Sequence, residues 1–372
     1  MPTTGPDTER SSSTPDDLTS GHLLRRLLML FVLLGIIAIL VVSLPGLGSL
    51  RHRFGDADWR LLVVIGLLKL GSCLSNVVAF RDVFCPRMGW RFSYQLAMAE
   101  QATDRLVPTG GAGGLALGAW ALHQEGMATE TIARRSVCFF VLTSLPNFVC
   151  VMVLAPVLLT GALSGTIPTA PTVVFGVLSW ATVAVIVALP RILHRYGAAG
   201  ERRGGWAGKL RLAAISLEKG IRDVGVLLAE RRWQAILGAC GYLAFDIAAL
   251  CVAFAAFGAG APIGPLVFAY VVGQLGGLIP LPGGIGGTDG GLIGALVLYG
   301  APLSTATAAT LAYRAFQLGV PAVLGTIAFF GLRHTLIGLP RPGEKPSSGS
   351  ASVTAGDAAG ERERIPAHDR DA

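Results

Sequence analysis

Six long apolar stretches constrain the fold of this chain more than any other feature. They are almost free of charged side chains and cover residues 27–44, 60–80, 137–159, 172–189, 233–257 and 305–330. A helix needs about 20 predominantly apolar residues to cross the hydrocarbon core of a bilayer. Only 14% of the 372 residues are charged, whereas soluble domains carry about 25%. The sequence therefore predicts an all-α, polytopic membrane helix bundle with about six full spans.

The first apolar stretch follows Arg25 and Arg26, as the core of a secretory signal peptide would. A signal peptide has an apolar core of about 7–15 residues and then a small-residue cleavage site, and this stretch is longer. We therefore expect a retained span at the start of a transmembrane domain of residues 23–339. Residues 1–22 and 340–372 are polar and rich in Ser and Pro, which predicts disordered tails.

Two segments rich in glycine and proline interrupt the apolar sequence. Their helix-breaking residues are Pro108, Gly110 and Gly111 in the first segment and Pro280, Pro282, Gly283, Gly284 and Gly286 in the second. The apolar pieces beside them are shorter than the roughly 20 residues of a full span. Irregular backbone at membrane depth is tolerated only where protein or a water-filled cavity satisfies it. We therefore expect two re-entrant hairpins, each broken by its glycines.

The two broken segments have similar surroundings, which favours an inverted repeat. In each, proline precedes the glycines, a short apolar run follows, and full spans lie before and after. The positive-inside rule places Arg25, Arg26 and the basic loop of residues 191–232 in the cytoplasm. Following the spans from there puts both termini in the cytoplasm and gives the two sets opposite orientations, a transporter architecture. A chance likeness is the alternative, because the chain holds 49 glycines.

The basic loop of residues 191–232 contains one apolar helical stripe. It holds ten Lys and Arg residues against four acidic ones. Apolar side chains recur in it at spacings of four and three, at Leu210, Ala214, Leu217, Ile221, Val224 and Leu228. This period is that of an amphipathic helix. Two interpretations stay open: a basic helix lying on the anionic inner leaflet, and a linker helix packed on the protein.

Charged residues inside the apolar regions are the candidate substrate-path residues. They are Lys69, Glu100, Asp104, Arg105, Asp246, Asp289 and Arg314. Such charges are costly in a membrane and usually face a cavity or a partner. Asp289 follows the second glycine break and Arg314 lies in the next span, so the two are placed to pair or to hold an anionic head group together. A structural ion pair that braces the hairpin is the alternative.

No catalytic, metal or cofactor site emerges from the other residues. The six cysteines form no Cys-x-x-Cys pair, and five lie in apolar runs, as small buried hydrophobic residues do. No Ser/His/Asp or Cys/His arrangement can be assembled. The net charge of +7 lies mainly in loops and tails, without the compact basic domain of a nucleic-acid-binding protein. We therefore expect no enzyme activity, cofactor, metal or nucleic-acid partner.

The second broken segment resembles a known family. Pro280-Leu281-Pro282-Gly283-Gly284-Ile285-Gly286, the acid Asp289 and the pair Tyr313-Arg314 are similar to motifs of the lysylphosphatidylglycerol synthase transmembrane-region family, also called flippase-like proteins. Arg105-Leu106-Val107-Pro108 with Gly110-Gly111 resembles the motif of its first half. The resemblance covers roughly residues 25–335. A glutamate is more usual in this family where Asp289 stands.

The resemblance implies an integral membrane domain that translocates lipids. On this basis we expect a plasma-membrane lipid translocase that moves a phospholipid, an aminoacyl-phospholipid or a polyprenyl-linked lipid between leaflets. Its expected partners are membrane lipids, the anionic inner leaflet and enzymes of envelope lipid synthesis. Two alternatives stay open: a membrane-embedded enzyme that modifies lipids, and a non-transporting scaffold for envelope biogenesis.

Overall fold

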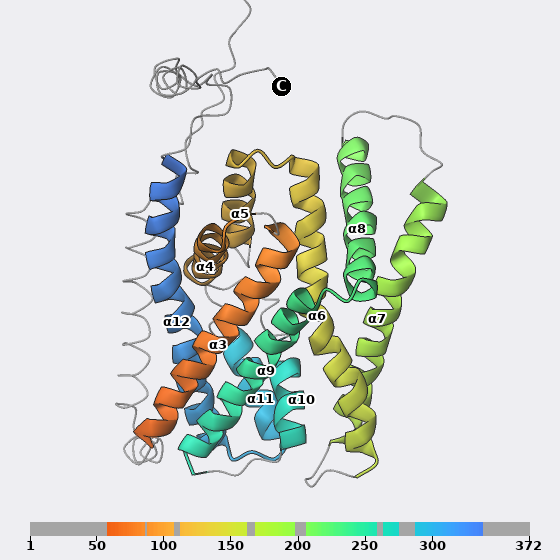
Figure 1. Cartoon of the computed structure of the whole chain (residues 1–372). Coiled ribbons are helices and arrows are strands. Elements are labelled where there is room, and N and C mark those ends of the chain that lie inside the picture. Colours follow the sequence, from red (N-terminus) through yellow and green to blue (C-terminus); the bar gives the residue numbers. More distant parts are fainter. Residues whose placement is uncertain are drawn as a thin grey trace, which may run out of the picture.

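The computed structural model describes residues 58–85, 88–107, 112–161, 168–197, 206–258, 263–274 and 287–337. Within these ranges it contains ten helices and no strands (Figure 1), which confirms the all-α bundle. The predicted first span and the two predicted tails lie outside the described residues. So do all eight helix-breaking residues, Pro108, Gly110, Gly111, Pro280, Pro282, Gly283, Gly284 and Gly286.

Five helices in the described ranges are long and apolar enough to cross a membrane. They are α3 (Trp59–Phe84), α6 (Thr129–Leu159), α7 (Thr169–Gly197), α9 (Trp233–Ala256) and α12 (Leu303–Ile337). They correspond to five of the six predicted spans. Helix α6 begins earlier than the predicted residue 137, because its polar first turns pack against α8 rather than forming a loop.

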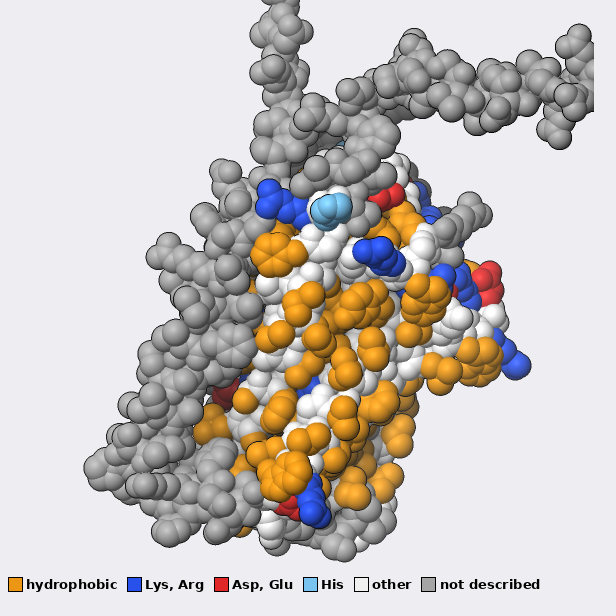
Figure 2. Space-filling model, turned by 60° about the vertical axis from the view of Figure 1, so that its left-hand side comes forward, with side chains coloured by type: hydrophobic (Ala, Val, Ile, Leu, Met, Phe, Trp, Pro, Cys, Tyr) orange, Lys and Arg blue, Asp and Glu red, His pale blue; other side chains and the backbone are white. Residues whose placement is uncertain are grey.

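The outer faces of these helices are apolar. Each exposes large hydrophobic side chains, for example Leu67, Phe140, Val177, Leu237 and Ile327. Figure 2 shows hydrophobic side chains across the middle of one face, with most visible Lys and Arg near its margins. A large apolar surface of this kind marks a membrane or protein contact. With the length of the helices, it indicates a multi-pass membrane protein.

Two pairs of short helices occupy the positions of the predicted hairpins. The first pair is α4 (Trp90–Leu106) and α5 (Ala112–Gln124), and the second is α10 (Ile263–Gln274) and α11 (Gly287–Leu298). The members of each pair pack against each other. The first pair lies in the upper half of the bundle in Figure 1 and the second in the lower half. The hairpins therefore occupy opposite halves of the protein.

The helices that flank the two hairpins run in opposite directions. In Figure 1, α3 rises toward the first hairpin, whereas α9 descends toward the second. Helix α6 likewise descends after the first hairpin and α12 rises after the second. Helices α3 and α9 also pack closely: a Cβ at Gly238 of α9 would lie 2.6 Å from the Ala79 nitrogen of α3. This arrangement is the one that the inverted repeat predicted.

Helix α8 (Trp206–Ala229) packs along α6 and α7, which favours the linker-helix interpretation of the basic loop. Ile221 and Val224 are buried as predicted, but Leu227 is buried and Leu228 is 42% exposed. The prediction of Leu228 was wrong because spacings of three and four both fit a helix face, and only the position of α6 selects between them. Lys219 Nζ lies 2.9 Å from Glu130 Oε1 and joins the two helices.

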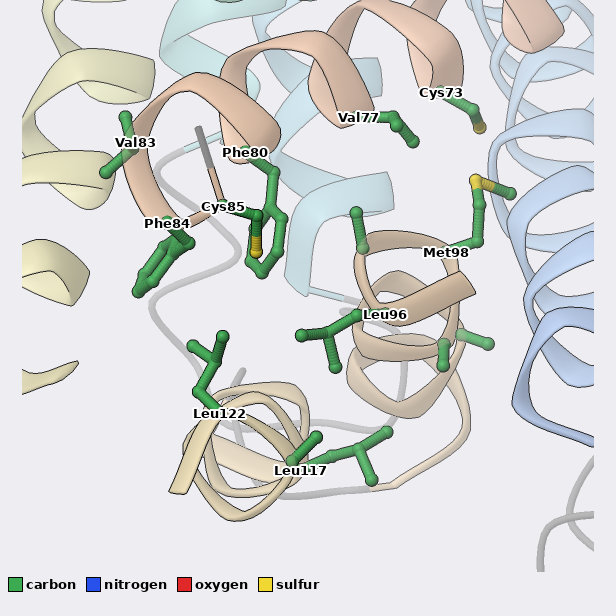
Figure 3. Close-up of a cluster of buried hydrophobic side chains, with 14 of the residues drawn as sticks. Cys73, Val77, Phe80, Val83, Phe84, Cys85, Leu96, Met98, Leu117 and Leu122 are labelled. Carbon is green, nitrogen blue, oxygen red and sulfur yellow. The ribbon is translucent and has the colours of Figure 1, made fainter. Parts of the chain in front are cut away.

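The buried apolar side chains fall into two clusters that lie along the bundle. The first joins the end of α3 to α4, α5, α6, α8 and the end of α12. Figure 3 shows Phe80 and Phe84 of α3 pointing toward Leu96 of α4 and Leu122 of α5. The second cluster joins the start of α3 to α9, α10, α11 and the start of α12. The charged side chains of the spans lie where these two clusters meet.

Candidate functional site: a charged layer between two apolar cores

A buried ion pair joins the two helices at the centre of the bundle. Lys69 of α3 and Asp246 of α9 are only 3% and 0% exposed, and they bind each other. On α3, Lys69 lies between Ile65 of the second cluster and Cys73 of the first. On α12, the clusters likewise meet between Tyr313 and Leu318. We call the polar side chains between the two clusters the charged layer.

The Asp246 carboxylate is surrounded by donors from three helices. Ser72 Oγ donates to Asp246 Oδ1 at 2.6 Å. The hydroxyls of Tyr270 and Tyr313 donate to Oδ2 at 3.0 and 3.2 Å. The Lys69 ammonium also lies 5.2 Å from the centre of the Tyr313 ring, which is within range of a cation–π interaction. This carboxylate therefore ties α3, α9, α10 and α12 together.

A second ion pair links the second hairpin to the last span. Arg314 Nε of α12 donates to Asp289 Oδ1 of α11 at 2.5 Å. Arg314 Nη1 donates to Gln317 Oε1 at 2.6 Å. The Arg314 side chain is 5% exposed and that of Asp289 is 18% exposed. The predicted pairing of these two residues is confirmed, and the pair lies one residue from Tyr313 of the Asp246 network.

Arg105 brings a third cation to the charged layer from the end of α4. Its side chain is half-buried and hydrogen-bonds the Tyr242 hydroxyl of α9. It is close enough to Asp246 for an electrostatic interaction. Among the described side chains, however, it has no ion-pair partner, and its Nε has no hydrogen-bond acceptor. The last residues before the first glycine break therefore present a guanidinium that no described carboxylate binds directly, although Asp104 and Asp246 are close enough to act on it electrostatically.

Among the described side chains of this layer the cations outnumber the carboxylates by one, while Asp104 beside Arg105 binds the Gly114 N–H of α5. Three cations, Lys69, Arg105 and Arg314, meet two carboxylates, Asp246 and Asp289. Lys69 binds Asp246 and Arg314 binds Asp289, so Arg105 is the cation of this layer that has no ion-pair partner among the described residues. A cation inside an apolar surrounding is costly unless it is paired. The arrangement is therefore suited to an anion.

Glu100 and Asp104 contact the partner helix of their own hairpin. The Gly114 backbone N–H of α5 donates to Asp104 Oδ1 at 2.8 Å. A carboxylate near the first turn of a helix is stabilised by its free N–H groups and dipole. The Glu100 carboxylate lies against Gly118, where a Cβ would be 2.9 Å from Oε2. These two acids therefore brace α4 against α5. The seven candidate substrate-path residues thus form two groups: Glu100 and Asp104 lie within the first hairpin, and the other five lie in the charged layer.

The neutral side chains that bind the charged residues of this layer were not predicted from the sequence. These are Ser72, Tyr242, Tyr270, Gln274 and Gln317. Gln274 donates to the Tyr270 hydroxyl at 2.7 Å, and the two residues are four apart on a short apolar helix, a spacing that places them on one face. Ser72 stands three residues after Lys69, on the same face. A spacing of three or four residues was the pattern in the sequence that could have indicated these partners.

The sequence matches one known family over most of its length. The family model described as "Lysylphosphatidylglycerol synthase TM region" matches residues 27–325. The match includes every residue of the charged layer, from Lys69 to Gln317. A comparison with curated proteins finds no match. The match extends well beyond half of the chain, and this protein therefore belongs to the family of the lysylphosphatidylglycerol synthase TM region.

Proposed function

We propose that this protein is a lipid translocase that moves the phosphate-bearing head group of a lipid past the charged layer. The observation that carries the proposal is Arg105, a cation in the layer with no carboxylate at ion-pair distance among the described residues. Its family places it in the lipid or envelope metabolism of a membrane. Arginine donates to phosphate oxygens in a planar fork. The acyl chains would stay in the bilayer, against the apolar outer faces of the helices.

The two hairpins support a path with one half on each side of the layer. Each hairpin contributes a cation or carboxylate beside its glycine break, Arg105 before the first and Asp289 after the second. Transporters with opposed repeats bind substrate between them, near the bilayer midplane, and rock one repeat against the other. The crossing of α3 and α9 at Lys69 and Asp246 is the position about which we expect this motion.

The proposal also includes the membrane, the orientation and the partners of the protein. The basic loop of residues 191–232 favours a plasma-membrane orientation with both termini in the cytoplasm. The membrane lipids of that leaflet would be its direct partners, with enzymes of envelope lipid synthesis as suppliers. We propose a transporter rather than an enzyme. The lipid content of cells that lack the protein distinguishes these roles. Loss of a transporter leaves the amount of its lipid unchanged but alters the distribution of that lipid between the leaflets, whereas loss of an enzyme removes a lipid species.

Leaflet exchange in vesicles tests the translocation itself. The full chain is reconstituted with fluorescent phospholipids, and the dye in the outer leaflet is bleached by an impermeant reductant. We expect faster exchange than in empty vesicles. Arg105→Gln should slow it by about ten- to a hundredfold, because a hydrogen bond to a charged group contributes about 1.5–3 kcal/mol.

Arg222→Gln is the matched control, because Arg222 is exposed on α8, away from the layer. It should leave the rate of exchange unchanged. If no lipid class exchanges faster than in empty vesicles, the proposed function is wrong. If exchange is fast but Arg105→Gln matches the wild type, translocation stands and the role of Arg105 does not.

A further inference from the structure

A cavity of about 190 Å³ lies away from the charged layer, between the end of α3, the first turns of α6, the end of α8 and the start of α9. Its volume corresponds to about six water molecules at roughly 30 Å³ each. Six charged residues line it: Asp82, Arg134, Arg135, Asp223, Glu230 and Arg232. Three are cations and three are acids, so the lining is neutral overall, unlike the charged layer.

Two buried groups in this lining have no hydrogen-bond partner among the residues that the structure describes. Asp82 binds Arg232 through Oδ1, but its Oδ2 is buried without a donor. Arg134 Nε lies 3.0 Å from Asp223 Oδ2, yet its N–H has no hydrogen-bond acceptor. Leaving a buried donor or acceptor without a hydrogen-bond partner is costly, most of all for charged groups. The cavity thus offers one acceptor and one donor that a ligand would satisfy.

We propose that this cavity binds a zwitterion that carries an ammonium group and a phosphodiester, the chemistry of glycerophosphoethanolamine. The ammonium has three donors and no acceptor, so it suits Asp82 Oδ2. The phosphate suits Arg134 and Arg135, because guanidinium groups bind phosphate oxygens with charge-assisted hydrogen bonds. A neutral lining favours a ligand without net charge, since a lone anion or cation would leave an unbalanced charge in the cavity.

This binding site is separate from the proposed translocation of lipid. It shares no residue with the charged layer, and binding there does not require translocation. Two sources carry the same chemistry: free glycerophosphoethanolamine, and the head group of phosphatidylethanolamine in the adjoining leaflet. The cavity lies beside the end of α3, where Arg135 Nη1 donates to the Phe84 carbonyl at 2.6 Å, and residues of α8 line another side of it.

Calorimetric titration of the purified full chain in nanodiscs of phosphatidylglycerol tests the site. Glycerophosphoethanolamine is the probe, and inorganic phosphate and ethanolamine are titrated separately. We expect the zwitterion to bind at least about tenfold more tightly than either half, which corresponds to 1.4 kcal/mol. A parallel measurement replaces part of the nanodisc lipid with phosphatidylethanolamine. If the lipid is the natural source, it should compete with the free probe and weaken its apparent affinity.

Asp82→Asn and Arg134→Gln should each weaken the binding of the zwitterion about tenfold or more. Asp82→Asn should reduce the affinity for ethanolamine more than that for phosphate, and Arg134→Gln should do the reverse. Arg134→Gln is informative even if Asp82→Asn misfolds, since Arg134 is more exposed. Arg222→Gln, outside the cavity on the same helix as Asp223, should bind as the wild type does. If the zwitterion fails to bind, or binds both variants as tightly as the wild type, the proposal is wrong. Leaflet exchange of the same variants is measured in vesicles and is expected to persist.

Discussion

Asp246 is the residue on which most of the charged layer depends, because it accepts from Lys69, Ser72, Tyr270 and Tyr313. Removing one partner of a buried ion pair costs about 3–5 kcal/mol, whereas replacing both is often neutral. We therefore expect Asp246→Asn to destabilise the protein strongly, and Lys69→Met in the same chain to recover more than half of the loss. Thermal unfolding of the detergent-solubilised protein measures both. Asparagine keeps an acceptor for the two tyrosines.

Ser72→Ala serves as the control for this pair of variants. It removes one donor to Asp246 and leaves both charges in place, so its cost should stay near the roughly 1 kcal/mol of a typical hydrogen bond. A double variant that is as unstable as Asp246→Asn alone would show that the tyrosine contacts, rather than the charge of Lys69, govern the stability of the layer.

Arg314 tests whether the shape of a cation matters as well as its charge. Its Nε binds Asp289 and its Nη1 binds Gln317, two contacts that the single ammonium of lysine cannot reproduce in the same geometry. Arg314→Lys should therefore slow leaflet exchange by about tenfold or more, with the loss of one hydrogen bond to a charged group at about 1.5–3 kcal/mol. Asp289→Glu keeps the charge and should retain most of the activity. Equal rates for Arg314→Lys and wild type would contradict this.

Single residues were predictable from the sequence where they carry charge in an apolar surrounding. Lys69, Asp246, Asp289 and Arg314 were found because the membrane makes such charges costly. The hydroxyl and amide partners of these residues were not found, because a neutral Ser, Tyr or Gln in an apolar helix costs much less and has no distinctive pattern. Which carboxylate braces a hairpin and which pairs with a span depends on helix positions that the sequence does not contain.

At the scale of elements, five of the six predicted spans and the two pairs of short helices followed from the lengths of the apolar runs. The packed face of α8 did not, as Leu227 and Leu228 show. Helix boundaries also depended on tertiary contacts. The polar start of α6 is helical because its charged side chains bind α8, with Arg134 beside Asp223 and Glu130 beside Lys219. Apolar length alone cannot reveal such an extension.

Close packing of α12 on α4 gives a prediction with a definite sign. A Cβ at Gly325 would collide with the Met98 carbonyl oxygen and the Ala102 side chain of α4, whereas one at Gly319 on the same helix meets nothing within 4 Å. Overpacking costs about 1–3 kcal/mol, while Gly to Ala inside a helix gains about 0.5–1 kcal/mol. Gly325→Ala should therefore lower the melting temperature, and Gly319→Ala should leave it unchanged or raise it. The same sign for both variants would argue against this contact.

At the scale of the whole molecule, the opposed directions of α3 and α9 and of α6 and α12 require the two hairpins to connect on opposite faces of the membrane. The turn after α5 contains the exposed Glu125, and the turn between α11 and α12 contains the exposed Pro302. In cells whose native cysteines are replaced in this protein, an impermeant thiol reagent should label Pro302→Cys from outside. Glu125→Cys should react only after the membrane is opened.

Arg222→Cys on α8 serves as the cytoplasmic reference in this labelling experiment, because the basic loop of residues 191–232 is expected in the cytoplasm. It should behave as Glu125→Cys does and remain unlabelled in intact cells. If Glu125→Cys and Pro302→Cys react from the same side, the hairpins are not inverted, and rocking of opposed repeats about the α3–α9 crossing cannot move a head group. If they react from opposite sides but Arg222→Cys is labelled from outside, the inverted repeat stands and the whole protein is turned over, with the 190 Å³ cavity facing the outer leaflet.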